Sequence, residues 1–269
     1  MKLSEITKKE YNNLEQKEII SCSDNKIIDK LTNIYLQWKE KNILYYDFED
    51  FISLVYTSAK RKLQGKKIPY TSQDITVFSS ELFTSLTKKD SSKNGEDLWI
   101  DVGMEEGIFI SALINNHYVK TKQQEAYLLL TEDFGEEIQF LCYKNNGATI
   151  HIQGNCYANL CSEMRRGIVI ITGNAGYNAG ELMKGGTLRA PCANSSLGVM
   201  MQGGTIQVEG STDDHLGINM NDGCIQVKKN TAESTGYKMI GGTIIIEGNS
   251  GNHVGHQMNG GSIHIKGNA

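Results

Sequence analysis

The sequence lacks the features that mark several large classes of protein. No stretch reaches the roughly 18 uninterrupted apolar residues of a membrane-spanning helix, and the start, MKLSEITKKEYNN, is too polar for a secretory signal. The 27 Lys and Arg are fewer than the 31 Asp and Glu, so the strongly basic surface of a general nucleic-acid binder is missing. We therefore expect a cytoplasmic protein that binds neither membranes nor nucleic acid.

Proline and closely spaced cysteines are also scarce. The six cysteines show no CxxC spacing and are spread over 269 residues, so we expect reduced thiols rather than a disulfide framework. Only 2 Pro accompany 28 Gly, and 23 of these glycines follow Asn146. This shift in composition predicts two unlike domains, residues 1–146 and 147–269.

The second domain is periodic. Seven segments of the type G-x-I-x-V-x-G begin 18 or 19 residues apart, and a methionine recurs in the same register. Within each segment two apolar residues flank a variable one, which is the alternation of a half-buried strand. The segments begin at Ala148, Gly167, Gly186, Gly204, Gly223, Gly242 and Gly261. The methionines are Met164, Met183, Met201, Met220, Met239 and Met258.

This period predicts a coil rather than alternating strands and helices. Nineteen residues leave no room for a crossover helix, so equivalent strands must stack in parallel, about 4.8 Å apart. Glycine suits the sharp corners because it adopts positive φ without a steric cost. We expect a single-stranded parallel β-helix of about seven 19-residue coils, with the methionines inside it because their flexible side chains fill irregular gaps.

The repeats resemble a known family. The segment GGTIIIEGNSGNHVGHQMNGGSIHIKGNA, from Gly241 to Ala269, is similar to the GXGXG domain, and ITGNAGYNAGELMKGG from Ile171 fits the same pattern. That domain occurs at the C-terminus of the glutamate synthase large subunit and in the C subunit of formylmethanofuran dehydrogenase. The resemblance covers about residues 147–269. It implies a right-handed β-helix that packs domains or subunits of an oxidoreductase together, with no catalytic residue or cofactor of its own.

The repeat departs from the family pattern at three places. Cys192 and Lys229 replace the glycine that ends a strand, and Cys161 replaces a corner glycine. We expect the coils at these positions to be distorted or capped.

The first domain resembles neither the amidotransferase nor the flavin-binding domain of glutamate synthase. Helical spacing of apolar residues predicts helices over residues 24–41, 47–64, about 73–88 and 105–117. Strands are predicted to begin at Asp97, Ala126 and Glu137. We expect an α+β domain that leads directly into the first coil.

Few residues offer chemistry. His253 and His256 have a spacing that metal ligands use, but no Cys or carboxylate accompanies them within the repeat, so we favour solvated turn histidines. Cys156 and Cys161 flank a turn and are candidates for a redox or metal pair, although buried, inert thiols are the favoured interpretation. No catalytic, cofactor-binding or metal residue is predicted beyond these weak candidates.

The sequence favours an assembly function and leaves two alternatives open. The main hypothesis is a non-catalytic scaffold whose β-helix binds a protein partner or a second copy of itself. The first alternative is an enzyme with its active site in the first domain or at the domain junction. The second is a β-helix that binds or hydrolyses carbohydrate; Glu209 and Glu247 share an outward column, as glycan-cleaving carboxylates do, but Lys228 between them favours a charge-balanced face.

Overall fold

The described residues of the N-terminal part of the molecule include four helices. The computed structural model describes residues 25–39, 48–66, 68–87, 103–121, 125–130 and 138–269. The helices are α3 (Asn25–Lys39), α4 (Phe48–Gln64), α5 (Ser72–Thr87) and α6 (Met104–Thr121). These confirm the four predicted helices. The strand predicted to begin at Asp97 starts outside the described residues.

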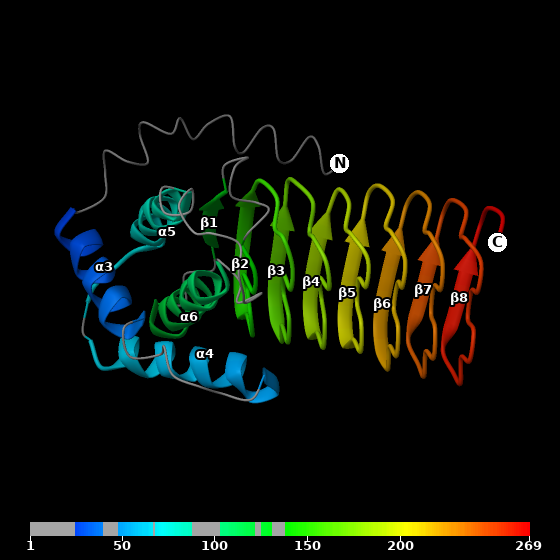
Figure 1. Ribbon diagram of the computed structural model, residues 1–269, viewed down its shortest axis with the longest axis horizontal. Coiled ribbons are helices and arrows are strands. Elements are labelled where there is room, and N and C mark those ends of the chain that lie inside the picture. The colour runs from blue at the N-terminus through cyan, green and yellow to red at the C-terminus, as the bar shows by residue number, and fades with distance from the viewer. Residues whose placement is uncertain (1–24, 40–47, 67, 88–102, 122–124, 131–137) are drawn as a thin grey trace, which may run out of the picture.

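The described residues that follow these helices form a parallel β-solenoid with about 6 turns of about 19 residues. Its eight strands pair in chain order in a single parallel sheet (Figure 1). They are β1 (Glu125–Leu129), β2 (Asn146–Gln153), β3 (Arg166–Ile171), β4 (Lys184–Ala190), β5 (Gln202–Val208), β6 (Asp222–Val227), β7 (Thr243–Ile246) and β8 (Ser262–Ile265). The sheet begins upstream of residue 146, because Ala126 of β1 pairs with Ile150 of β2. None of the described helices combines the length and the apolar character that a membrane crossing requires.

The inward side chains form continuous files along the solenoid, as the repeat predicts. Met164, Met183, Met201, Met220 and Met239 are fully buried, and so are the inward strand residues from Val169 to Ile246. The stack ends at the coil of β8, where Met258, Ile263 and Ile265 are only partly buried. Burial of one file by the next coil is therefore the main source of the solenoid's hydrophobic stability.

Helix α6 covers the N-terminal end of the solenoid. Gly107, Ser111 and Asn115 lie four residues apart, so they share one face of this helix. The Ser111 hydroxyl donates to the Phe140 carbonyl at 3.0 Å and accepts the Tyr143 N–H at 3.2 Å. A Cβ on Gly107 would lie 1.9 Å from the carbonyl oxygen of Gln139, so only glycine permits this close approach. The helix thus satisfies backbone groups that a further coil would otherwise bind.

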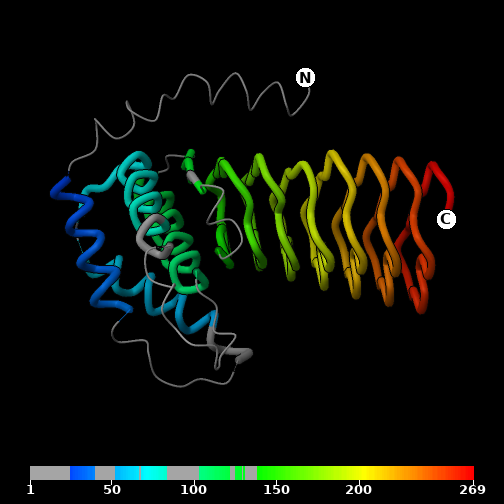
Figure 2. The backbone as a smooth tube through the Cα atoms, turned by 45° about the horizontal axis from the view of Figure 1, so that its top comes forward, coloured from blue at the N-terminus to red at the C-terminus, as the bar shows by residue number. Residues whose placement is uncertain are grey.

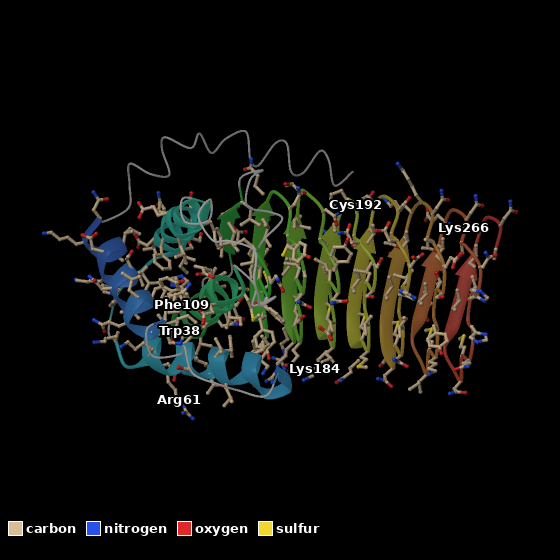
Figure 3. The ribbon with its side chains drawn as sticks, in the orientation of Figure 1. Trp38, Arg61, Phe109, Lys184, Cys192 and Lys266 are labelled. Carbon is tan, nitrogen blue, oxygen red and sulfur yellow. The ribbon has the colours of Figure 1, made fainter. Side chains whose placement is uncertain are left out.

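The other helices pack around α6 (Figure 2). Trp38 of α3 and Phe109 of α6 lie with their ring centroids 5.2 Å apart (Figure 3). Next to them, Lys39 pairs with the buried Glu106 at 2.6 Å, and the Tyr35 hydroxyl donates to the same carboxylate. This ion pair therefore fastens α3 to α6.

The prediction of a strand that begins at Glu137 is wrong for the residues that the structure describes, from 138 onward. Residues 138–140 contribute only an isolated bridge from Gln139 to Ala158, and residues 141–144 form a turn. Cys142 has φ 62°, like Cys161 at the equivalent corner one coil later. The apolar run that indicates a strand is instead a solenoid corner, whose inward side chains are apolar for the same reason.

The corner at Cys161 is not distorted. Its φ of 63° is close to the 72° of Gly180. A Cβ on Gly180 would lie 2.5 Å from Cδ1 of Ile206, on the second strand after that corner. The residue at the equivalent place on the second strand after Cys142 is Val169, and after Cys161 it is Leu188. Valine has no δ carbon, and leucine branches at Cγ rather than at Cβ, so both differ in shape from isoleucine. The cysteine corners are thus matched by strand residues of a different shape.

Candidate functional site

Two residues lie at the corner of each coil, and we call such a pair a tip. A tip lies between the corner Gly or Cys and the next inward residue, and its second residue has φ between 51° and 57°. The N–H of that residue donates to the carbonyl of the first residue of the next tip, at 2.8 to 3.0 Å. The tips are therefore stacked in a rigid row. They are Tyr143–Lys144, Ser162–Glu163, Glu181–Leu182, Val199–Met200, Ile218–Asn219, Tyr237–Lys238 and His256–Gln257.

Helix α4 lies against the first of these tips. Lys144 Nζ donates to Ser53 Oγ at 3.0 Å and lies 4.8 Å from the ring centroid of Tyr143 and 5.8 Å from that of Tyr56. The two tyrosine rings meet edge to face at 5.2 Å. A cation between two aromatic faces is attracted by both ring quadrupoles. The tip Tyr143–Lys144 is therefore a built binding site for a helix.

Glu163 of the second tip completes this cluster. Its carboxylate accepts the Tyr143 hydroxyl at 2.7 Å and pairs with Lys144 at 3.5 Å and Lys184 at 3.1 Å. Figure 3 shows Lys184 at the edge of the solenoid along which α4 lies. We call Tyr143–Lys144 and Ser162–Glu163 the covered tips, since they contact or adjoin α4.

Burial and neighbouring charges set the ionisation of this cluster. Burial lowers the pKa of Lys144; Glu163 opposes this effect, and the nearby cations of Arg165 and Lys184 add to it. Burial by itself raises the pKa of Glu163, but hydrogen bonds from Tyr143 and Lys184 and the two lysine charges outweigh it, so this pKa is lowered. The arrangement thus favours an ionised carboxylate between two ammonium groups.

A second stretch of the row has no described helix over it (Figure 1). Its three tips carry Val199, Met200, Ile218 and Tyr237 as outward apolar or aromatic side chains. Met200 is 42% exposed, and the other three are half-buried. We call Val199–Met200, Ile218–Asn219 and Tyr237–Lys238 the uncovered tips.

The candidate thiols lie inside the solenoid. Cys156 and Cys161 are fully buried, and Cys142, from the preceding corner, lies with them. Burial raises the pKa of both Cys156 and Cys161, and the neighbouring thiols raise it further. The Cys156 thiol donates to the Ile138 carbonyl at 3.2 Å. These thiols are therefore held in the unreactive, protonated form. Sequence reasoning missed Cys142 because it precedes the predicted domain boundary.

The candidate histidines lie at an exposed corner. The ring centroids of His253 and His256 are 6.0 Å apart, and His256 stacks on Tyr237 at 5.7 Å. Over the part of the chain that the structure describes, no three His, Cys, Asp or Glu side chains are grouped so that they could hold a metal ion. His256 thus extends the aromatic character of the tip row.

Outward side chains on the strands interact with the equivalent side chains of the neighbouring coil. Lys228 binds Glu209 at 2.6 Å and Lys266 binds Glu247 at 3.3 Å, as a charge-balanced face requires. Arg189 donates to Gln207, which donates to Gln226.

Sequence reasoning also missed an exposed pair of aromatic side chains on the turns. The rings of Tyr157 and Tyr177 lie 5.8 Å apart at an interplanar angle of 67°. At that angle they do not form one flat surface on which a sugar ring could stack.

The chain matches no protein-family model, and a search of curated proteins finds no significantly similar sequence.

Proposed function

We propose that the chain is a cytoplasmic, non-catalytic assembly scaffold. Its solenoid would hold domains or subunits together, as the resemblance to the GXGXG domain implies, in a glutamate synthase-like or formylmethanofuran dehydrogenase-like complex. The observation that carries the proposal is the row of uncovered tips. Outward Val199 and Met200 lie on one coil and Ile218 on the next, where the Met200 N–H donates to the Ile218 carbonyl, so the three form one apolar strip. Contiguous apolar surface of this kind is typical of protein interaction sites.

The rest of the solenoid supports a structural role. Its interior is filled by apolar side chains, and Cys142, Cys156 and Cys161 are buried there, with the pKa of Cys156 and of Cys161 raised by burial. The backbone ladder that joins the tips makes the strip rigid. A rigid strip loses little conformational entropy when a partner binds, which favours affinity.

A pull-down with matched variants tests this proposal. The full chain, tagged, is recovered from native lysate as wild type, Met200→Asp, Ile218→Asp and Leu36→Asp. Leu36 is 49% exposed on α3, away from the tips, and serves as the control. We expect one partner chain, retained by wild type and Leu36→Asp and lost from the two tip variants. A monomer that retains no chain in any variant would refute the scaffold.

A second candidate is an enzyme with its active site at the junction of α4 and the solenoid. Ser53 Oγ lies 3.0 Å from Lys144 Nζ, and the pKa of Lys144 is lowered, chiefly by burial. A lysine of lowered pKa beside a hydroxyl is one way to activate a serine nucleophile. Glu163 opposes this role because its charge favours the ammonium form of Lys144.

A fluorophosphonate probe separates the two functions. Labelling of Ser53 that disappears in Lys144→Met supports the enzyme. An unlabelled Ser53 in the intact chain contradicts it.

A further inference from the structure

The first and sixth tips carry the same two residues in the same conformation. Lys144 has φ 53° and Lys238 has φ 54°. Lys144 Nζ lies 4.8 Å from the Tyr143 ring centroid, and Lys238 Nζ lies 5.0 Å from that of Tyr237. The chain therefore repeats this Tyr–Lys pair, with the same lysine–ring geometry, five coils apart along the row.

Helix α4 shows what such a tip binds. Ser53 and Tyr56, three residues apart, lie on one face of α4 and contact the tip lysine through a hydroxyl and a ring. The Tyr56 ring also packs edge to face on Tyr143. As a result Tyr143 is buried, whereas its counterpart Tyr237 is half-buried and Lys238 is exposed.

The size of the free strip also fits a helix. The uncovered tips span two coil spacings, about 10 Å, which about seven residues of an α-helix would cover. Figure 1 shows α4 lying along the long axis of the solenoid. A helix on the uncovered tips would follow the same row farther from the helical end, with Val199, Met200 and Ile218 beneath its apolar face.

We propose that the uncovered tips bind an amphipathic helix of a partner protein. At position i this helix presents a hydroxyl residue to Lys238, and at position i+3 it presents a tyrosine to Tyr237 and Lys238. This inference rests on the proposed scaffold function and names the partner's chemistry. The occupant is a partner rather than a second copy's α4, because Ser53 and Tyr56 of α4 are already engaged within their own chain. The covered tips thus serve as the template for the uncovered ones.

A labelled α4 peptide is the probe for the site. A fluorescent peptide of residues 48–64 is titrated against the full-length protein, and its anisotropy is followed. We expect saturable binding that is at least tenfold weaker with Ile218→Asp and with Lys238→Met, and unchanged with Leu36→Asp, whose side chain lies on α3 away from the tips. A peptide in which Ser53 and Tyr56 are both Ala should bind at least tenfold more weakly than the natural peptide. Thermal melting of each variant verifies that the fold is intact.

Other results would overturn the inference. Loss of binding in Lys144→Met alone would mean that the peptide only replaces the chain's own α4. No saturable binding, or equal binding by every variant, would mean that the uncovered tips do not recognise such a helix. A concentration-dependent dimer that Ile218→Asp abolishes would identify a second copy as the occupant.

Cross-linking in lysate distinguishes a failure of the helix proposal from a failure of the scaffold proposal. A photo-crosslinking residue at position 219 should join to a helical segment of the retained partner that contains tyrosine. Cross-links to an extended strand, or a partner retained without any cross-link from position 219, refute the helix but leave the scaffold standing. Absence of any retained chain refutes the scaffold itself.

Discussion

The covered and uncovered tips have one backbone geometry but different surroundings. Both belong to a single hydrogen-bonded row, and both contain a Tyr–Lys pair with a cation over a ring. Over the covered tips, α4 buries Tyr143 and supplies Ser53 and Tyr56. Over the uncovered tips no described helix lies; Met200 is exposed there, and Val199 and Ile218 are half-buried. The difference indicates that a solenoid corner becomes a docking site through its two variable residues, while the repeat supplies a constant frame.

The largest expected effect separates the inward frame from the outward tips. Met200 and Met201 are adjacent, but Met201 is fully buried and Met200 is 42% exposed. Met201→Ala should lower the free energy of unfolding by about 2 to 5 kcal/mol because it empties a core site. Met200→Ala should change it by less than about 0.5 kcal/mol. Urea denaturation followed by circular dichroism measures both, and equal losses would contradict the division into inward and outward positions.

The next largest effect concerns helix α6, which packs against the backbone beside the first covered tip. Gly107→Ala places a Cβ 1.9 Å from a backbone oxygen, so α6 must shift, at a cost of about 1 to 3 kcal/mol. Gly65→Ala is the control, since its Cβ would meet only ordinary contacts at 3.7 and 3.8 Å. Thermal and urea melts compare the two. If both variants are equally stable, α6 does not depend on this close approach to the first corner.

The third comparison uses the two tip tyrosines. The Tyr143 hydroxyl donates to Glu163 at 2.7 Å in a partly buried site, whereas that of Tyr237 donates to Gln257 at 3.3 Å at an exposed position. Tyr143→Phe should cost about 1 kcal/mol of stability, and Tyr237→Phe should cost almost nothing. Equal effects in urea melts would show that α4 does not change the environment of the tip.

The repeat made the solenoid predictable, but not the docking of the helices on it. Period, strand alternation and the inward methionines follow from chemistry that recurs every 18 or 19 residues, so each coil reinforces the prediction for the next. The prediction of a strand from Glu137 was wrong because a solenoid corner and a strand both place apolar residues inward. Cys142 could not be linked to Cys156 and Cys161 without knowing that a coil precedes residue 147.

The tip cluster was missed for a related reason. Lys144 and Glu163 lie in variable columns, which periodic analysis treats as filler between the repeated positions. One signal was available, because the dipeptide Tyr-Lys occurs at the same place in two coils, at Tyr143 and Tyr237. Contacts with Ser53 and Tyr56 depend on tertiary packing, which no local pattern encodes.

The smallest expected effect is the pH dependence of the covered tips. The pKa of Glu163 is lowered in the folded chain, so its contribution to stability is fully present above the pKa of an unfolded glutamate, about 4.3. That contribution is lost as the pH falls through the lower, folded-state pKa. Urea midpoints measured from pH 7 to pH 3 should therefore fall less in Glu163→Gln than in wild type. Glu247→Gln is the control: its Lys266 partner is 65% exposed, and exposed ion pairs contribute little, so its profile should follow that of wild type. The same pH dependence in Glu163→Gln as in wild type would mean that the ionised carboxylate does not stabilise the folded chain.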